Sequence, residues 1–255
     1  MHVMNTPDEN QPLSADEALM TLIQGLQSFR RDVYPQQREL FKRLANTQQP
    51  RIMFITCADS RIVLELITQS EPGSLFVTRN VGNVVPPYGQ MNGGVSSAIE
   101  YAVLGLGVQH IIVCGHSDCG AMKAVLNPAS QDSMPTVKAW LRHTDAARSV
   151  VESHCSCGPH KTQAPHKTQA PHETQGPHET LKVLTEENVV AQLNHLRTHP
   201  SVAARLATRQ LSIHGWVYDI ESCTIRTYDA SARQFVPLDG NSLPAASPQS
   251  RHECA

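Results

Sequence analysis

Three short apolar runs constrain the fold of this 255-residue chain more than any other feature of its sequence. They occupy residues 51–56, 75–78 and 111–114, and within each run apolar residues follow one another instead of alternating with polar ones. Such runs are typical of strands that are buried on both faces. Helical patterns over 60–69 and 94–106 separate the runs. Because strands alternate with helices, we predict an α/β fold with a mostly parallel central sheet and flanking helices.

The region after the third run completes the predicted sheet. A fourth strand is expected within 210–220, preceded by a helix at about 185–197. A hairpin partner at 224–228 is expected to form one antiparallel edge strand.

The N-terminal region is predicted to form a helical arm. Ser14 and Glu17 have the spacing of a capping box, in which each side chain bonds the backbone of the other. Apolar residues then follow at helical spacing: Leu19, Leu22, Ile23, Leu26 and Phe29. This stripe needs a surface to cover it, so we expect the arm to pack on a partner subunit.

A repeat with a period of six interrupts the α/β pattern. From Pro159 the chain reads PHKTQA, PHKTQA, PHETQG and PHET, inside an insertion at about 154–182. The recurring histidines, with Cys155 and Cys157, are compatible with an auxiliary metal-binding tract. We favour an expanded surface insertion, because nothing fixes the ligand geometry. The predicted units are a disordered N-terminus, the helical arm, the main α/β domain with this insertion, and a flexible tail: 1–13, 14–46, 47–238 and 239–255.

Charge and cysteine content exclude several classes of protein. The 21 basic and 23 acidic residues give a net charge of -2, which argues against a nucleic-acid partner. No run of about 18 apolar residues exists, so we expect no membrane span, and the polar N-terminus suggests no signal peptide. Seven cysteines, an odd number, favour a reducing, cytoplasmic location. There, Cys114 and Cys223 are expected to pack in or near the sheet.

A candidate metal centre follows the predicted strands. Cys57 comes directly after the first strand, and His116 and Cys119 come directly after the third. Ligand sites in open α/β sheets gather at the carboxyl ends of strands, so these three side chains are expected to meet. One imidazole and two thiolates suit a single Zn²⁺ ion, and three protein ligands leave a fourth position for water. The sequence therefore predicts a catalytic zinc.

Two charged residues beside the first ligand are candidate catalytic groups. Asp59 lies close enough in sequence to Cys57 to face the metal, and the guanidinium fork of Arg61 suits a bidentate grip on its carboxylate. If Arg61 releases Asp59, that carboxylate can become a fourth zinc ligand and close the site. A permanently closed, structural zinc is the alternative at this point.

These motifs make the chain similar to a known family. With CADSR at 57–61 and HSDC at 116–119, the chain resembles the bacterial type of β-class carbonic anhydrase. Further matching segments are FVTRN at 76–80, PPYG at 86–89 and HGWVYD at 214–219. The resemblance implies reversible, zinc-dependent hydration of carbon dioxide (CO₂) to bicarbonate and a proton. In that reaction a zinc-bound hydroxide, oriented by Asp59 and Arg61, attacks CO₂.

The resemblance also implies an assembly and a substrate pocket. We expect a homodimer or homotetramer. Gln48 is expected to reach the substrate across the dimer interface, Phe76 and Tyr101 to form pocket walls, and Val81 and Gly82 to lie beside the pocket. Family members with a second, inhibitory bicarbonate site carry tryptophan and glycine at the positions of Phe54 and Thr56. Their absence here argues for the non-allosteric type.

Other functions stay open at this stage. The same zinc set and fold can hydrolyse carbon disulfide, and a protein that kept the fold could be a non-catalytic zinc-binding scaffold. The presence of both Asp59 and Arg61 argues against the scaffold. A nucleotide-binding domain is not supported, since no glycine-rich phosphate loop follows the first strand. For His214, within a predicted strand, a role in the core or in hydrogen bonding is favoured over metal ligation.

Overall fold

The structure, a computed structural model, describes residues 13–90, 93–156, 176–238 and 240 of the chain. The predicted disordered N-terminus and C-terminal tail, and most of the hexapeptide repeat, lie outside these residues. The chain divides into two compact units, Met1–Gln48 and Gln49–Ala255. None of the described helices is long and apolar enough to cross a bilayer.

The N-terminal unit is helical. It contains helix α1 (Ala15–Ser28), a π-helical turn (η1, Phe29–Val33), a 3₁₀ turn (η2, Tyr34–Gln37) and helix α2 (Arg38–Leu44). The predicted capping box is present, because the Glu17 N–H donates to Ser14 Oγ and the Ser14 N–H donates to the Glu17 carboxylate, at 3.3 and 2.8 Å. None of the α1 residues is buried. Its apolar side chains are therefore exposed in the single chain.

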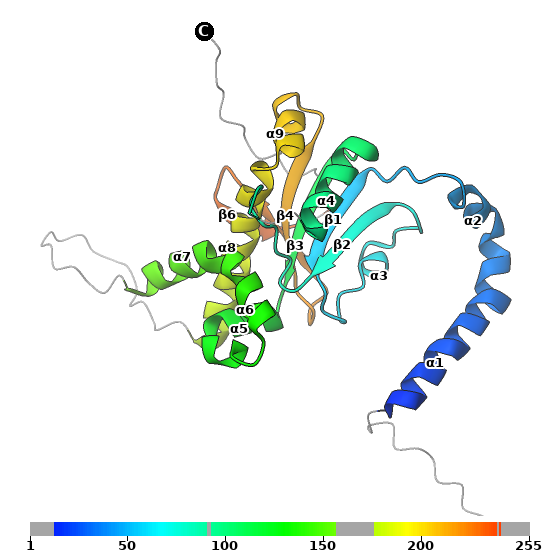
Figure 1. Cartoon of the computed structure of the whole chain (residues 1–255), viewed down its shortest axis with the longest axis horizontal. Helices are drawn as coiled ribbons and strands as arrows, with labels where there is room; N and C mark the ends of the chain where they lie inside the picture. Colours follow the sequence, from blue (N-terminus) through cyan, green and yellow to red (C-terminus); the bar gives the residue numbers. More distant parts are fainter. Residues whose placement is uncertain (1–12, 91–92, 157–175, 239, 241–255) are drawn as a thin grey trace, which may run out of the picture. The chain divides into compact units, whose positions relative to one another are not determined.

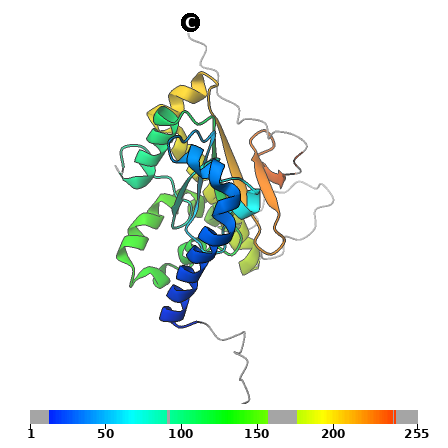
Figure 2. The same cartoon turned by 90° about the vertical axis from the view of Figure 1, so that its right-hand side faces the viewer.

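The second unit is built on a six-stranded sheet with the order β2-β1-β3-β4-β5-β6 (Figure 1). The strands are β1 (Ile52–Cys57), β2 (Leu75–Asn80), β3 (His110–His116), β4 (Ser212–Tyr218), β5 (Ile225–Asp229) and β6 (Gln234–Pro237). The first four are parallel, as predicted, and the hairpin formed by β5 and β6 adds an antiparallel edge, visible in orange in Figure 2. The short strand β6 was not predicted, because its four residues carry no clear pattern.

The central strands are buried on both faces, which explains their continuous apolar sequence. In β1, Met53 and Ile55 pack on one face of the sheet, and Phe54 packs on the other. In β3, Ile111 and Ile112 repeat this alternation. Each of these side chains is nearly or fully buried, so each contributes ~1.5–3 kcal/mol of hydrophobic stabilisation.

The helices of the second unit connect the strands along the chain. They are α3 (Leu64–Thr68), α4 (Gly94–Glu100) with the π-helical turn η3 (Tyr101–Gly105), α5 (Gly120–Leu126), α6 (Pro135–Leu141), α7 (Asp145–Ser156), α8 (Pro177–Arg197) and α9 (Pro200–Ala207), with short 3₁₀ turns η4 (Pro128–Gln131) and η5 (Arg142–Thr144). Helix α8 packs directly on β3 and β4. A Cβ atom on Gly115 or Gly215 would lie within 2.9 Å of the side chain of Val189 in α8. Glycine is therefore required where this helix crosses the sheet.

Two helices differ in extent from the prediction. The helix expected over 60–69 forms only at Leu64–Thr68, because the segment before it turns around the Asp59–Arg61 pair. The helix expected from about 185 begins at Pro177, so the last repeat unit forms its first turn. Proline at the first helical position suits such a start.

Candidate metal centre

The three predicted ligands meet at the carboxyl end of the sheet. Cys57 is the last residue of β1, His116 is the last residue of the neighbouring strand β3, and Cys119 is the N-cap of α5. Their candidate ligand atoms all lie within 4.8 Å of one another. All three residues are buried, with exposed fractions of 6%, 0% and 1% respectively. The parallel register of β1 and β3 creates this group, because it brings the ends of both strands to one edge.

The imidazole of His116 is oriented as a metal ligand. Its Nδ1 lies 2.8 Å from the carbonyl oxygen of Ser117, so Nδ1 carries the proton and donates it. The other ring nitrogen, Nε2, is buried and has no hydrogen-bond partner in the described part of the chain. A buried nitrogen without a partner is costly unless something binds it. A backbone carbonyl that fixes the tautomer in this way is typical of metal-ligating histidines.

The sulfur atoms of Cys57 and Cys119 interact directly, and their pKa values move in opposite directions. A hydrogen bond from Cys119 opposes the effect of burial and lowers the pKa of Cys57 to about 4. The Gly82 N–H also donates to Cys57 Sγ, at 3.4 Å. The neighbouring Cys57 sulfur and burial raise the pKa of Cys119. A metal ligand must be a thiolate, so binding of a divalent cation would release the protons that these thiols carry.

Asp59 and Arg61 form the predicted dyad. Arg61 Nε and Nη2 donate to the two carboxylate oxygens of Asp59 at 3.0 and 2.8 Å, and the Arg61 backbone N–H adds a third bond of 3.0 Å. These bonds hold the pKa of Asp59 well below its usual range. Asp59 Oδ2 lies 3.9 Å from His116 Nε2. The ionised carboxylate is therefore beside the ligand group while Arg61 holds it.

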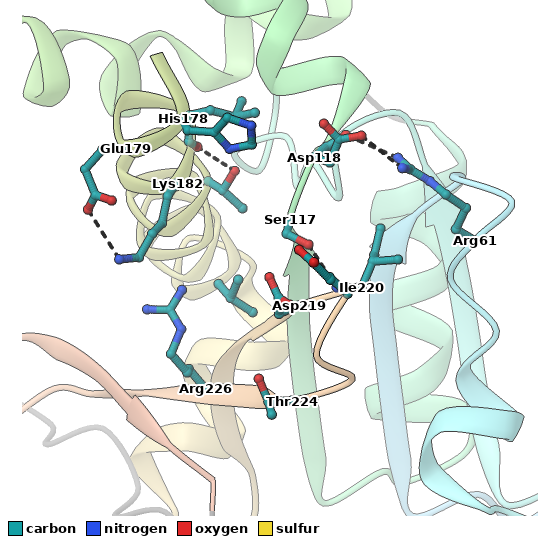
Figure 3. A pocket seen from close by; sticks show the side chains of 14 residues that line it. Arg61, Ser117, Asp118, His178, Glu179, Lys182, Asp219, Ile220, Thr224 and Arg226 are labelled. Atoms are coloured by element: carbon teal, nitrogen blue, oxygen red, sulfur yellow. Dashed lines mark hydrogen bonds and ion pairs between the residues drawn. The ribbon is translucent and has the colours of Figure 1, made fainter. Parts of the chain in front are cut away.

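A second carboxylate holds Arg61 from the other side. Arg61 Nη1 donates to Asp118 Oδ2 at 2.9 Å, and Lys123 pairs with the other oxygen of Asp118. Figure 3 shows Asp118 and Arg61 facing each other above the end of β3. Asp118 was not predicted from the sequence. Its position between the ligands His116 and Cys119 was the available signal.

Arg79 was also not identified as part of the site. From β2 its guanidinium donates to the carbonyl oxygens of Cys57 and Asp59, at 3.2 and 3.0 Å, and to that of Ile62. These bonds satisfy carbonyl groups of the turn that presents the dyad. Arg79 therefore supports the loop, whereas Arg61 supports the carboxylate.

The predicted pocket residues Phe76 and Tyr101 come from β2 and η3, and Val81 and Gly82 follow β2 in the loop that contacts Cys57. The rings of Phe76 and Tyr101 are 6.0 Å apart. Val81 is 40% exposed, and Trp140 Nε1 donates to its carbonyl oxygen. Gly82 adopts a φ of +80°, and a Cβ there would lie 3.0 Å from the Ala121 side chain.

Gln48 is the last residue of the N-terminal unit, and its assignment to the substrate pocket stays a prediction. The expected roles of Cys114 in the core and of His214 in hydrogen bonding are confirmed. Cys114 is buried, which raises its pKa to about 12, and His214 is hydrogen-bonded within the sheet. Cys223 is exposed in the turn between β4 and β5.

Comparisons with known proteins agree with this geometry. The family profile described as carbonic anhydrase matches residues 52–225. A carbonic anhydrase of Pseudomonas aeruginosa is 49% identical over 217 residues, covering 85% of this chain and 90% of that protein. The structure of the β-carbonic anhydrase CcaA is similar with a TM-score of 0.78 and 42% identity, over 92% of this chain and 93% of that one. A tetrameric β-carbonic anhydrase of Sordaria macrospora is similar with a TM-score of 0.68 and 27% identity, over 82% and 96%.

Fold and site together define an α/β metalloenzyme with a Cys–His–Cys donor set. The chain belongs to the carbonic anhydrase family, and its relatives identify it as a bacterial β-class member. This membership favours the hydration of CO₂ over the carbon disulfide and scaffold alternatives.

Proposed function

We propose that this protein catalyses the reversible hydration of CO₂ to bicarbonate and a proton, with one Zn²⁺ ion per chain held by Cys57, His116 and Cys119. The observation that carries the proposal is the meeting of three buried donor atoms within 4.8 Å, next to an ionised carboxylate. Family membership supplies the reaction, and the donor set supplies the preference for zinc.

The donor set fits a zinc ion on three counts. Sulfur and imidazole nitrogen are the ligands that zinc favours. The unpartnered Nε2 of His116 has its lone pair available, and the two buried sulfur atoms lie within 4.8 Å of it and of each other. A zinc ion held by three protein ligands supplies Lewis acidity, which lowers the pKa of a bound water molecule towards neutrality.

The chain's own residues orient the reactants. Because Asp59 stays ionised, it acts only as a hydrogen-bond acceptor, and it can therefore fix the direction of an attacking O–H group. Arg61 occupies both carboxylate oxygens of Asp59, so the carboxylate lies beside the donor atoms without being free to act as a ligand. Phe76, Val81 and Tyr101 are the proposed apolar surface for CO₂, which has no charge to bind. Gln48 of a partner subunit is the proposed polar contact.

The non-allosteric assignment rests on two buried side chains. The Phe54 ring packs edge-on against Trp216, with ring centroids 5.5 Å apart. Thr56 is fully buried, and its hydroxyl donates to the carbonyl oxygen of Cys114 at 3.1 Å. We propose that these residues fill the space that an inhibitory bicarbonate would need.

We propose a dimer or tetramer in a reducing, cytoplasmic environment. The exposed apolar face of α1 supports an assembly in which this helix is covered by a second copy. The free thiols of Cys57 and Cys119 support a reducing location, because oxidation would remove both sulfur ligands.

Stopped-flow CO₂ hydration between about pH 6.5 and 9, with zinc content measured on the same sample, tests the function. We expect about one zinc per chain and fast hydration that increases towards alkaline pH. Bound zinc without hydration at any pH would support the carbon disulfide or scaffold alternatives instead.

A further inference from the structure

A cavity lies at the start of β3, at the opposite end of this strand from the candidate metal centre. Strand β3 begins at His110, which lines this cavity, and ends at the ligand His116. The cavity has a volume of about 480 Å³, which is within the range of small-molecule sites. It lies between the start of β3 and β4 and the end of α9, and its polar lining is Gln109, His110, Arg205, Arg209, Gln210 and Ser212.

The charge of this cavity is positive. Two arginines, Arg205 and Arg209, contribute to its wall, and among the described residues no aspartate or glutamate does. Neither arginine forms an ion pair with any residue in the described ranges. Other arginines of this unit are paired, such as Arg226, which lies 2.5 Å from the carboxylate of Glu186. The two guanidinium groups are therefore free to bind an anion.

The turn after α9 holds these arginines in place. Arg209 has a φ of +57°, a conformation that glycine normally takes at a helix end. The N–H groups of Gln210 and Leu211 donate to the Arg205 carbonyl oxygen at 2.9 and 3.2 Å.

His110, which lines the cavity, forms a hydrogen bond with His214. His110 Nδ1 lies 3.1 Å from Nε2 of His214, which is in β4 behind it. Burial lowers the pKa of His214 to about 4, so this ring is neutral, and in one tautomer its Nε2–H donates to His110 Nδ1. In that arrangement Nε2 of His110 carries the proton and can donate it to an anion.

We infer that this cavity binds the phosphate group of a small molecule, or free phosphate. Guanidinium forks bind phosphate through paired hydrogen bonds, and two forks match its several oxygens better than the two oxygens of a carboxylate. Gln109, Gln210 and Ser212 add neutral donors. This site is separate from the metal centre, and its existence does not depend on the proposed reaction.

Isothermal titration of the zinc-loaded full chain with inorganic phosphate at low salt tests the inference. We expect saturable binding of about one phosphate per chain, weakened about tenfold or more in Arg205→Gln and in Arg209→Gln, because each removes a charge-assisted pair. Arg233→Gln is the matched control. It is exposed, has a φ of +53°, and does not line the cavity. Hydration of CO₂ and the unfolding temperature should not change in any of the three variants.

The inference would be overturned if the wild type showed no saturable binding, or if Arg233→Gln weakened binding as much as the cavity variants. It would also be overturned if removal of zinc abolished binding while both cavity variants kept it. If Arg209→Gln folds poorly, Arg209→Asn removes the charge while tolerating the positive φ. Ribose 5-phosphate distinguishes the two sources of the group. Tighter binding than phosphate indicates an organic phosphate, and weaker binding indicates free phosphate.

Discussion

Arg61 bridges two carboxylates, and the second of them, Asp118, lies between two metal-ligand candidates in the sequence. Arg61 Nη1 donates to Asp118 Oδ2 at 2.9 Å, while Nε and Nη2 hold Asp59. Asp118 has a φ of +57° in the turn between His116 and Cys119. The ligand loop and the dyad are therefore connected through one guanidinium group.

Asp118→Asn should weaken this connection without breaking the dyad. Both partners are more than 40% exposed, so the Arg61–Asp118 pair contributes at most about 1 kcal/mol. We expect kcat/KM for CO₂ hydration to fall about fivefold or less, with unchanged zinc content. A loss as large as the hundredfold expected for Asp59→Asn would show that Asp118 has a more direct role.

Asp59→Asn should separate metal binding from turnover. The substitution keeps the size of the side chain but removes the charge and places an amide beside the donor atoms. We expect normal zinc content and a kcat/KM about a hundredfold lower. Zinc content by atomic absorption and stopped-flow hydration are measured on the same sample. Unchanged turnover would remove Asp59 from the mechanism.

The free energy of unfolding should fall with acidity because of His214. Its folded pKa, about 4, is below the unfolded value, so the unfolded chain binds a proton that the folded chain does not. The contribution of His214 to the free energy of unfolding is therefore fully present above the unfolded pKa and is lost as the pH falls towards 4. We expect a loss of about 2 kcal/mol between pH 7.5 and 5 from this group. Urea unfolding of zinc-loaded His214→Gln should show a correspondingly smaller loss, and an identical pH dependence would contradict the assignment.

Gly215→Ala should destabilise the fold where α8 crosses the sheet. Its Cβ would lie 2.8 Å from Val189 and 2.9 Å from Leu193, both of which are buried. Overpacking of this kind costs ~1–3 kcal/mol, so the unfolding temperature should fall by several degrees. Gly94→Ala, at a position with no atom within 4 Å of the added Cβ, is the control and should have little effect.

Leu22→Asp in α1 should reduce the assembly state. Leu22 is 72% exposed in the single chain, and so the substitution has no described packing to disrupt. If α1 is covered by a second copy, a buried aspartate should shift the protein towards monomers in light scattering. Asp16→Asn, in the first turn of the same helix, is the control. An unchanged mass for Leu22→Asp would argue against this interface.

The sequence by itself determined the parallel strands, the capping box and the candidate ligand group of Cys57, His116 and Cys119. These features depend on local patterns: continuous apolar runs, the spacing of Ser14 and Glu17, and residue types placed directly after strands. The family resemblance added the reaction, because the motif around Cys57 is specific.

Only the tertiary structure decided which distant residues touch. The contact of Arg61 with Asp118, the support of the Cys57 loop by Arg79 and the pairing of His110 with His214 all join segments that are far apart in sequence. Their formation depends on strand order and register, which the packing of the whole domain determines. A local pattern carries no information about that register, and this is why the phosphate cavity and the second half of the Arg61 bridge were found only in the structure.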